Sequence, residues 1–150
     1  MKKLAILGAS LLLMAFNVSA ENCVIDVGVG DNMSFVPSSL EVSASKCSSV
    51  TIKLSHTGKL DRAVMGHNWV LTNTADAQAV AQAGWGAGLD NQYLPPGDSR
   101  IIAGSDIIGG GQDASVTFDM AGLSEGGDYT FFCSFVGHFA IMKGKFTVTA

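Results

Sequence analysis

The chain has 150 residues, of which 47% are hydrophobic and 15% are charged, and its formal net charge at pH 7 is −4. This length suits one domain that can bury a substantial core. A net acidic chain without a basic cluster argues against nucleic acid as a partner.

The first 20 residues have the pattern of a secretory signal peptide. Lys2 and Lys3 form a basic start, residues 4–16 are an apolar run, and Val18-Ser-Ala20 supplies the small residues of a cleavage site. We expect cleavage after Ala20, which leaves a domain of residues 21–150 and lowers the net charge to −6 because two lysines are lost. No later stretch is apolar over a length that could cross a bilayer, so we expect a soluble exported protein without membrane insertion.

The remaining sequence is typical of short β-strands separated by turns rich in glycine. Alternating apolar residues predict strands over residues 25–29, 40–44, 50–56, 69–72, 100–105, 116–120, 129–133 and 143–150. The only helical pattern runs from Ala75 to Ala83, where Asn73 or Thr74 can cap the start and Gly84 can end the helix. Seven or eight short strands with one helix in an insertion predict an all-β fold, a two-sheet Greek-key sandwich in a single domain.

The chain has three cysteines, an odd number for an exported protein. Cys23 and Cys47 both lie in the first third of the sequence, and a disulfide between them would leave Cys133 free. Closing that loop of about 25 residues would contribute about 3 kcal/mol to stability. A free thiol in an oxidising compartment is at risk of oxidation, and binding a metal ion would protect it.

The stretch Cys133-Ser-Phe-Val-Gly-His138-Phe-Ala-Ile-Met142 combines a thiol, an imidazole and a thioether without any charged residue. A blue-copper electron-transfer site needs two histidines, one cysteine and a long axial methionine. We expect the second histidine to be His67, which lies just before the strand that begins at Trp69. Taken singly, Cys133 could be a buried structural thiol, Met142 a core residue, and either histidine an ordinary loop residue. Their conjunction favours a copper site.

The third histidine is interpreted differently. His56 alternates with Val50, Ile52 and Leu54, so these four side chains share one face of a strand. We therefore place His56 beside the core and do not include it among the ligands.

These motifs together resemble the azurins, bacterial blue-copper proteins of the cupredoxin superfamily. The likeness covers nearly all of residues 21–150 and includes the spacing Cys-x4-His-x3-Met. The other matching segments are the Cys23/Cys47 pair, Leu54-Ser-His56, Val64-Met-Gly-His-Asn-Trp-Val-Leu71, Tyr93-Leu, Asp98-Ser-Arg100, Ser115-Val-Thr-Phe-Asp119 and Phe131-Phe-Cys-Ser-Phe-Val-Gly-His138.

The resemblance implies a role for each matching residue. His67, Cys133 and His138 would be the strong in-plane ligands of one type 1 copper, Met142 the axial sulfur, and the Gly66 carbonyl a weak ligand opposite it. Asn68 and Ser134 would tie the two ligand-bearing loops together, since bonds around the ligands fix their orientation. Cys23 and Cys47 would form the single disulfide of the family.

The resemblance also implies the function and its surface. The protein would be an electron carrier rather than an enzyme, a monomer that docks briefly with c-type cytochromes or with periplasmic reductases and dehydrogenases. An apolar patch around His138 would serve this docking, because transient redox interfaces are small. Its members would be Met33, Leu60, Val64, Met65, Phe135, Val136, Phe139, Ala140 and Ile141.

Several residues depart from the azurin pattern. Val136 stands where the family usually has proline, Phe139 where it has a small residue, and Thr57 where a proline follows the internal histidine. Trp85, in the insertion, lies outside the pattern and receives no role. Trp69 matches a buried core tryptophan of the family.

Three other functions are alternatives to the electron carrier. A periplasmic copper chaperone or buffer is the main alternative, although such proteins use exposed clusters of methionine or histidine, which this sequence lacks. A copper oxidase or nitrite reductase needs further histidine ligands, and only His56 would remain. A structural zinc site is disfavoured because a histidine pair with one cysteine and a methionine is a poor closed zinc site.

Overall fold

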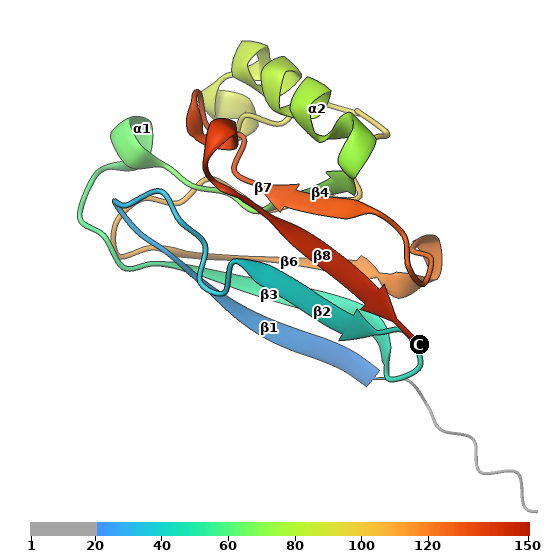
Figure 1. Cartoon of the computed structure of the whole chain (residues 1–150). Coiled ribbons are helices and arrows are strands. Elements are labelled where there is room, and N and C mark those ends of the chain that lie inside the picture. The colour runs from blue at the N-terminus through green and yellow to red at the C-terminus, as the bar shows by residue number, and fades with distance from the viewer. Residues whose placement is uncertain (1–20) are drawn as a thin grey trace, which may run out of the picture.

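The computed structural model describes residues 21–150, in which two β-sheets pack against each other and one long helix lies outside them (Figure 1). The three-stranded sheet has the order β1 (Glu21–Val29), β3 (Cys47–His56) and β6 (Asp113–Asp119). The five-stranded sheet has the order β2 (Ser39–Ser43), β8 (Lys143–Thr149), β7 (Tyr129–Phe132), β4 (Val70–Asn73) and β5 (Ala103–Gly104). The predicted two-sheet Greek-key sandwich is confirmed. The expected signal peptide and its cleavage site lie outside the described residues.

Two of the strand pairs are parallel and join segments that are distant in sequence. β1 runs parallel to β3, and β2 runs parallel to β8, whereas β3–β6, β7–β8, β4–β7 and β4–β5 are antiparallel. A disulfide between Cys23 and Cys47 ties the start of β1 to the start of β3. Cys133 is the one free cysteine of the described chain.

The core between the sheets is aromatic and centres on Trp69. Its indole is fully buried and stacks on Phe131 and Phe118, with ring centroids 5.6 and 5.9 Å apart. Phe146 from β8 meets the same indole edge-on. Trp69 directly follows the segment that carries His67 and Asn68, so the centre of the core fixes this segment in place.

The long helix α2 (Thr74–Ala87) covers the outer face of the five-stranded sheet next to β4 and β7 (Figure 1). Ala77, Val80 and Ala81 pack there against Val70 and Phe132, which form a second, smaller core. The prediction that Gly84 ends this helix was wrong. Gly84 is a buried residue of the helix, where a Cβ would clash with the carbonyl of Tyr93. The helix ends instead at Gly88, whose φ of 74° favours glycine.

The other helices are short. α1 (Arg62–Met65) lies between β3 and β4, and the Asp61 carboxylate caps it by accepting a bond from the Ala63 N–H. Three 3₁₀ turns follow: η1 (Leu89–Asn91), η2 (Met120–Gly122) and η3 (His138–Ala140). None of the helices within residues 21–150 has the length and apolar character needed to cross a lipid bilayer.

One predicted strand is much shorter than expected. Of residues 100–105, only Ala103 and Gly104 pair with β4. Arg100 instead closes a turn, since its backbone N–H and its guanidinium both bond the Asp98 carboxylate.

Candidate metal centre

Three side chains with metal-binding atoms meet at one end of the sandwich. His67 lies just before β4, Cys133 directly follows β7, and His138 opens η3 in the loop between β7 and β8. The ligand atoms of the three side chains all lie within 4.8 Å of one another, and all three residues are buried. His138 alone keeps a trace of exposure, at 5%. The structure therefore brings together the three strong ligands that the sequence predicted.

The distances from the thiol sulfur to the two imidazole nitrogens suit a shared metal ion. Cys133 Sγ lies 3.7 Å from His67 Nδ1 and 3.6 Å from His138 Nδ1. A metal bound at about 2.1 Å to nitrogen and about 2.3 Å to sulfur, with angles near 120°, would hold such atoms about 3.8 Å apart. Two imidazoles and a thiolate are also the in-plane donors of a blue-copper site.

A hydrogen bond fixes which nitrogen of His67 faces the cluster. Nε2 lies 3.0 Å from the carbonyl oxygen of Gly30, which can only accept, so Nε2 carries the proton. Nδ1, which faces Cys133, is left with its lone pair free for a metal ion.

Burial also sets the protonation of the cluster. Burial lowers the pKa of His67 to about 4, an effect that the bond to Gly30 partly opposes, and it lowers the pKa of His138 as well. Both imidazoles are therefore neutral at pH 7, the form that binds metal. Burial raises the pKa of the Cys133 thiol to about 12, so without a cation the sulfur keeps its proton. A metal ion would supply the charge that stabilises the thiolate.

The loop from Cys133 to Met142 is closed at its two ends. The Cys133 N–H donates to the carbonyl of Met142 at 3.0 Å, and the Met142 N–H donates to that of His138 at 2.8 Å. Gly137 has a φ of 81°, the left-handed region that glycine allows, where the chain turns into η3. Met142 itself is buried in the main core.

Gly66, the predicted weak ligand, lies close to the cluster. Its carbonyl oxygen is 3.9 Å from Cys133 Sγ. A Cβ at this position would clash with the carbonyl of Arg62 and with Ile107. Only glycine therefore lets this backbone approach the thiol.

The predicted pair Asn68 and Ser134 joins the two ligand-bearing segments. Asn68 Nδ2 donates to Ser134 Oγ at 2.8 Å, and the Ser134 backbone N–H donates to Asn68 Oδ1 at 2.9 Å. Both residues are fully buried. Asn68 follows His67 and Ser134 follows Cys133, so the pair sets the distance between the two donors.

His56 lies beside the cluster but is not part of it. Its Nδ1 accepts from the Gly58 N–H at 3.0 Å, and its Nε2–H donates to the Met65 carbonyl at 3.1 Å. Its ring stacks on that of His67 with centroids 4.9 Å apart. Because both ring nitrogens are engaged, His56 has no free donor for a metal ion, in agreement with its predicted place at the core.

The residues of the predicted apolar patch differ in their exposure. Leu60, Val64, Val136, Ala140 and Ile141 are exposed, and Met33, Met65 and Phe139 are partly exposed. Phe135 is buried instead, since its ring packs between Tyr93 at 5.0 Å and His138 at 4.7 Å. Phe135 therefore lies beneath the surface and packs against the His138 imidazole.

Two residues that support the cluster were not found from the sequence. Gly30 accepts the bond from His67, and the backbone carbonyl of Gln92 accepts from Asn68 Nδ2 at 3.0 Å, while the Gln92 side chain accepts from the Ile107 N–H at 2.8 Å. The first two contacts are made by backbone carbonyls, which every residue has, so no side-chain pattern marks them.

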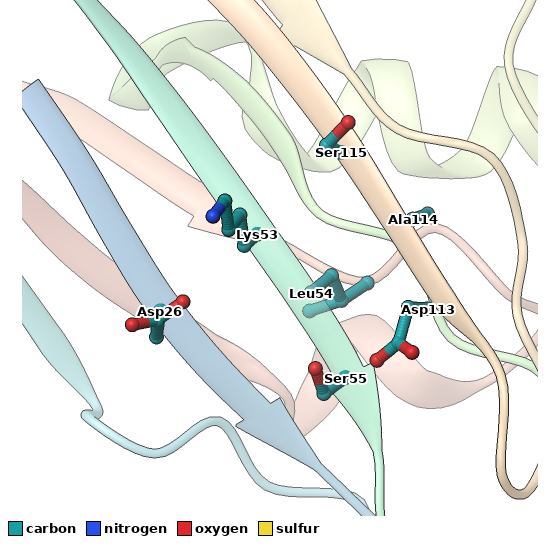
Figure 2. A pocket seen from close by; sticks show the side chains of 7 residues that line it. All are labelled: Asp26, Lys53, Leu54, Ser55, Asp113, Ala114 and Ser115. Carbon is teal, nitrogen blue, oxygen red and sulfur yellow. The ribbon is translucent and has the colours of Figure 1, made fainter.

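A surface hollow lies away from this cluster, on the outward face of the three-stranded sheet. Figure 2 shows Asp26 on β1, Lys53 and Ser55 on β3, and Asp113 on β6 around it. Asp26, Lys53 and Asp113 are exposed charges of both signs. Within residues 21–150, the cluster of His67, Cys133 and His138 is the one group of at least three His, Cys, Asp or Glu side chains placed to hold a metal ion.

Comparison with known proteins agrees with the geometry in indicating a copper site. Residues 21–149 match the family model of copper binding proteins of the plastocyanin/azurin family. An azurin of Bordetella pertussis is 55% identical over 141 residues, 93% of each chain, and an azurin of Pseudomonas aeruginosa is 47% identical over 148 residues, 99% of each chain. The solved structure of an azurin (Az-iso2) from Methylomonas sp. strain J superposes with a TM-score of 0.82 at 43% identity, over 85% of this chain and 98% of that one.

These findings and the buried donor set together establish the cofactor as a type 1 copper. They also agree with the disulfide between Cys23 and Cys47. The chain belongs to the plastocyanin/azurin family of copper-binding proteins.

Proposed function

We propose that this blue-copper protein is a soluble periplasmic carrier that moves one electron at a time between redox proteins. The observation that carries the proposal is the buried cluster in which Cys133 Sγ lies 3.6 and 3.7 Å from two imidazole Nδ1 atoms. In this proposal residues 21–150 are the exported domain, and residues 1–20 direct export.

Each donor has a proposed part in holding the copper. His67 Nδ1, Cys133 Sγ and His138 Nδ1 would be the three strong ligands, and the Met142 thioether and the Gly66 carbonyl would be weak ligands. When bound, copper supplies a reversible one-electron couple between Cu(II) and Cu(I). With these positions filled by protein, no open position remains for a substrate, in contrast to catalytic metal sites.

The residues around the donors keep them in place during the change of oxidation state. The Asn68–Ser134 pair fixes His67 relative to Cys133, the Gly30 carbonyl orients the His67 ring, and the bond between Cys133 and Met142 closes the loop. Cu(II) and Cu(I) prefer different geometries, so a donor set that does not move lowers the rearrangement that accompanies each transfer.

The proposed docking surface is the apolar patch, here Leu60, Val64, Val136, Ala140 and Ile141 with the partly exposed Met33, Met65 and Phe139. Four of its members lie in the loop of His138, the donor with remaining exposure, so an electron would leave through this patch. The proposed partners are c-type cytochromes or periplasmic reductases and dehydrogenases, and the protein acts as a monomer.

The test is the visible and EPR spectrum of the copper-loaded domain, with reversible voltammetry. We expect an intense blue charge-transfer band that bleaches on reduction and is lost in Cys133→Ser. A blue Cys133→Ser protein would contradict the assignment of the thiolate. Copper binding without reversible one-electron cycling would favour the alternative, a copper chaperone or buffer.

A further inference from the structure

The two aromatic residues that set this chain apart from the azurin pattern line the same hollow. Trp85 comes from α2, and Phe139 comes from the loop between β7 and β8. The hollow has a volume of about 420 Å³, within the range of small-ligand sites. Figure 1 shows the turn that carries residue 139 beside α2.

One face of α2 supplies a wall of the hollow. Gln78, Gln82 and Trp85 follow one another at spacings of four and three residues, so they form a single stripe along the helix. The stripe is exposed, with 39% of Trp85 accessible, whereas the neighbouring Ala77 and Ala81 face the sheet. It therefore contributes one indole and two amides to the lining of the hollow.

The opposite wall is an aromatic ring with a cation above it. The ring of Phe139 is held edge-on against Phe132 with centroids 5.3 Å apart, and Lys143 Nζ lies 4.6 Å from the Phe139 centroid. Within residues 21–150 no carboxylate lies within 4 Å of Lys143, whereas Lys145 on the same strand has Asp128 at 3.7 Å. No acidic side chain lines the hollow.

We propose that this hollow binds small planar aromatic anions, such as aromatic carboxylates. An aromatic ring would pack against Trp85 and Phe139, its negative group would lie at Lys143, and the amides of Gln78 and Gln82 would bond its polar edges. Gly137 and Ala140 complete the lining, so the bound molecule would lie beside the residues on either side of His138. The proposal does not depend on electron transfer by the protein.

The experiment is an NMR titration of the reduced, copper-loaded domain with 2-naphthoate. The chain has two tryptophans, so the indole N–H signal of the buried Trp69 serves as an internal control for that of Trp85. We expect saturable shifts of the Trp85 indole and of the Gln78 and Gln82 side-chain amides, with a Kd on the order of 1 mM, and no shift of Trp69.

Variants and analogues separate the proposed contacts. Lys143→Gln should raise the Kd about three- to fivefold, and Trp85→Ala about tenfold, whereas the matched control Lys145→Gln should not change it. The neutral 2-naphthamide and the non-aromatic cyclohexanecarboxylate should both bind more weakly than 2-naphthoate. Absence of a saturable Trp85 shift, equal effects of Lys143→Gln and Lys145→Gln, or equal binding of the three compounds would overturn the proposal. The blue band of the same samples, recorded after oxidation, tests the copper site separately.

Discussion

The side-chain amide of Asn68 bonds Ser134 in both directions, donating to its hydroxyl at 2.8 Å and accepting from its backbone N–H at 2.9 Å. Ser134 follows Cys133 in the sequence, and Asn68 follows His67. The two donors are therefore linked through their neighbours as well as through any metal ion between them, which leads to the first prediction.

Asn68→Ala should lower the free energy of unfolding of the copper-free protein by roughly 2–4 kcal/mol, because it leaves the buried N–H of Ser134 without an acceptor. Urea unfolding would measure the loss. Asn91→Ala is the control, since the side-chain bond of Asn91 to the Ala87 carbonyl is exposed and its removal should cost less than about 1 kcal/mol. Equal losses for the two variants would show that the Asn68–Ser134 link adds no more to the free energy of unfolding than an exposed hydrogen bond.

Met142→Leu should keep the copper and raise the reduction potential, because an apolar side chain in place of the thioether disfavours Cu(II). Each shift of about 59 mV corresponds to a tenfold change in the equilibrium of a one-electron couple. Voltammetry would record the change, with Met65→Leu in the apolar patch as a control of unchanged potential. A potential that falls or stays constant in Met142→Leu would argue against an axial role for Met142.

The low pKa of His67 predicts a loss of stability in acid for the copper-free protein. Its pKa is about 4 in the folded protein and 6.5 normally, so between these values the unfolded chain binds a proton that the folded chain does not. The stabilisation is complete above pH 6.5 and is lost as the pH falls toward 4. Between pH 7 and 4.5 the loss should be roughly 2 kcal/mol.

The measurement is urea unfolding at both pH values for the wild type and for His67→Gln. The variant lacks the titrating group but keeps every other one, so its stability should fall by roughly 2 kcal/mol less than that of the wild type. The same pH dependence in both proteins would show that His67 does not carry the effect.

Val136→Lys should slow electron exchange with a c-type cytochrome about tenfold or more, since it places a charge in the apolar patch, and it should leave the copper spectrum intact. Met65→Lys should act in the same way. Val24→Lys is a matched control, because Val24 on β1 is 51% exposed and Val136 is 50% exposed. Stopped-flow rates that respond equally to Val24→Lys and Val136→Lys would remove the patch from the proposed route.

Much of the fold and the three strong donors could be predicted from local patterns. The alternation of Val50, Ile52 and Leu54 fixes both the strand β3 and the burial of His56, because alternate side chains in a strand share a face. Because the alternation places His56 at the core, His56 was not predicted to be a ligand. The spacing of Cys133, His138 and Met142 predicted three ligands, and His67 was the remaining histidine. These features depend on residues that are close in sequence.

The features that were wrong or missed depend on tertiary contacts. Gly84 was expected to end a helix, but the closeness of the Tyr93 carbonyl explains why glycine is needed there. The four-residue helix α1 is too short to show a periodic pattern. The supporting bonds from His67 to Gly30 and from Asn68 to Gln92 end on backbone carbonyls that only the folded chain brings near.

The pairing of β2 with β8 makes the metal centre depend on a strand that is distant in sequence from β2. Leu40 lies opposite Phe146 in this parallel pair, and β8 is the one neighbour of β2 in the five-stranded sheet. β8 also follows Met142 directly and anchors the far end of the loop that carries Cys133 and His138. A change that loosens β8 should therefore free both the edge strand β2 and the loop that carries two of the donors.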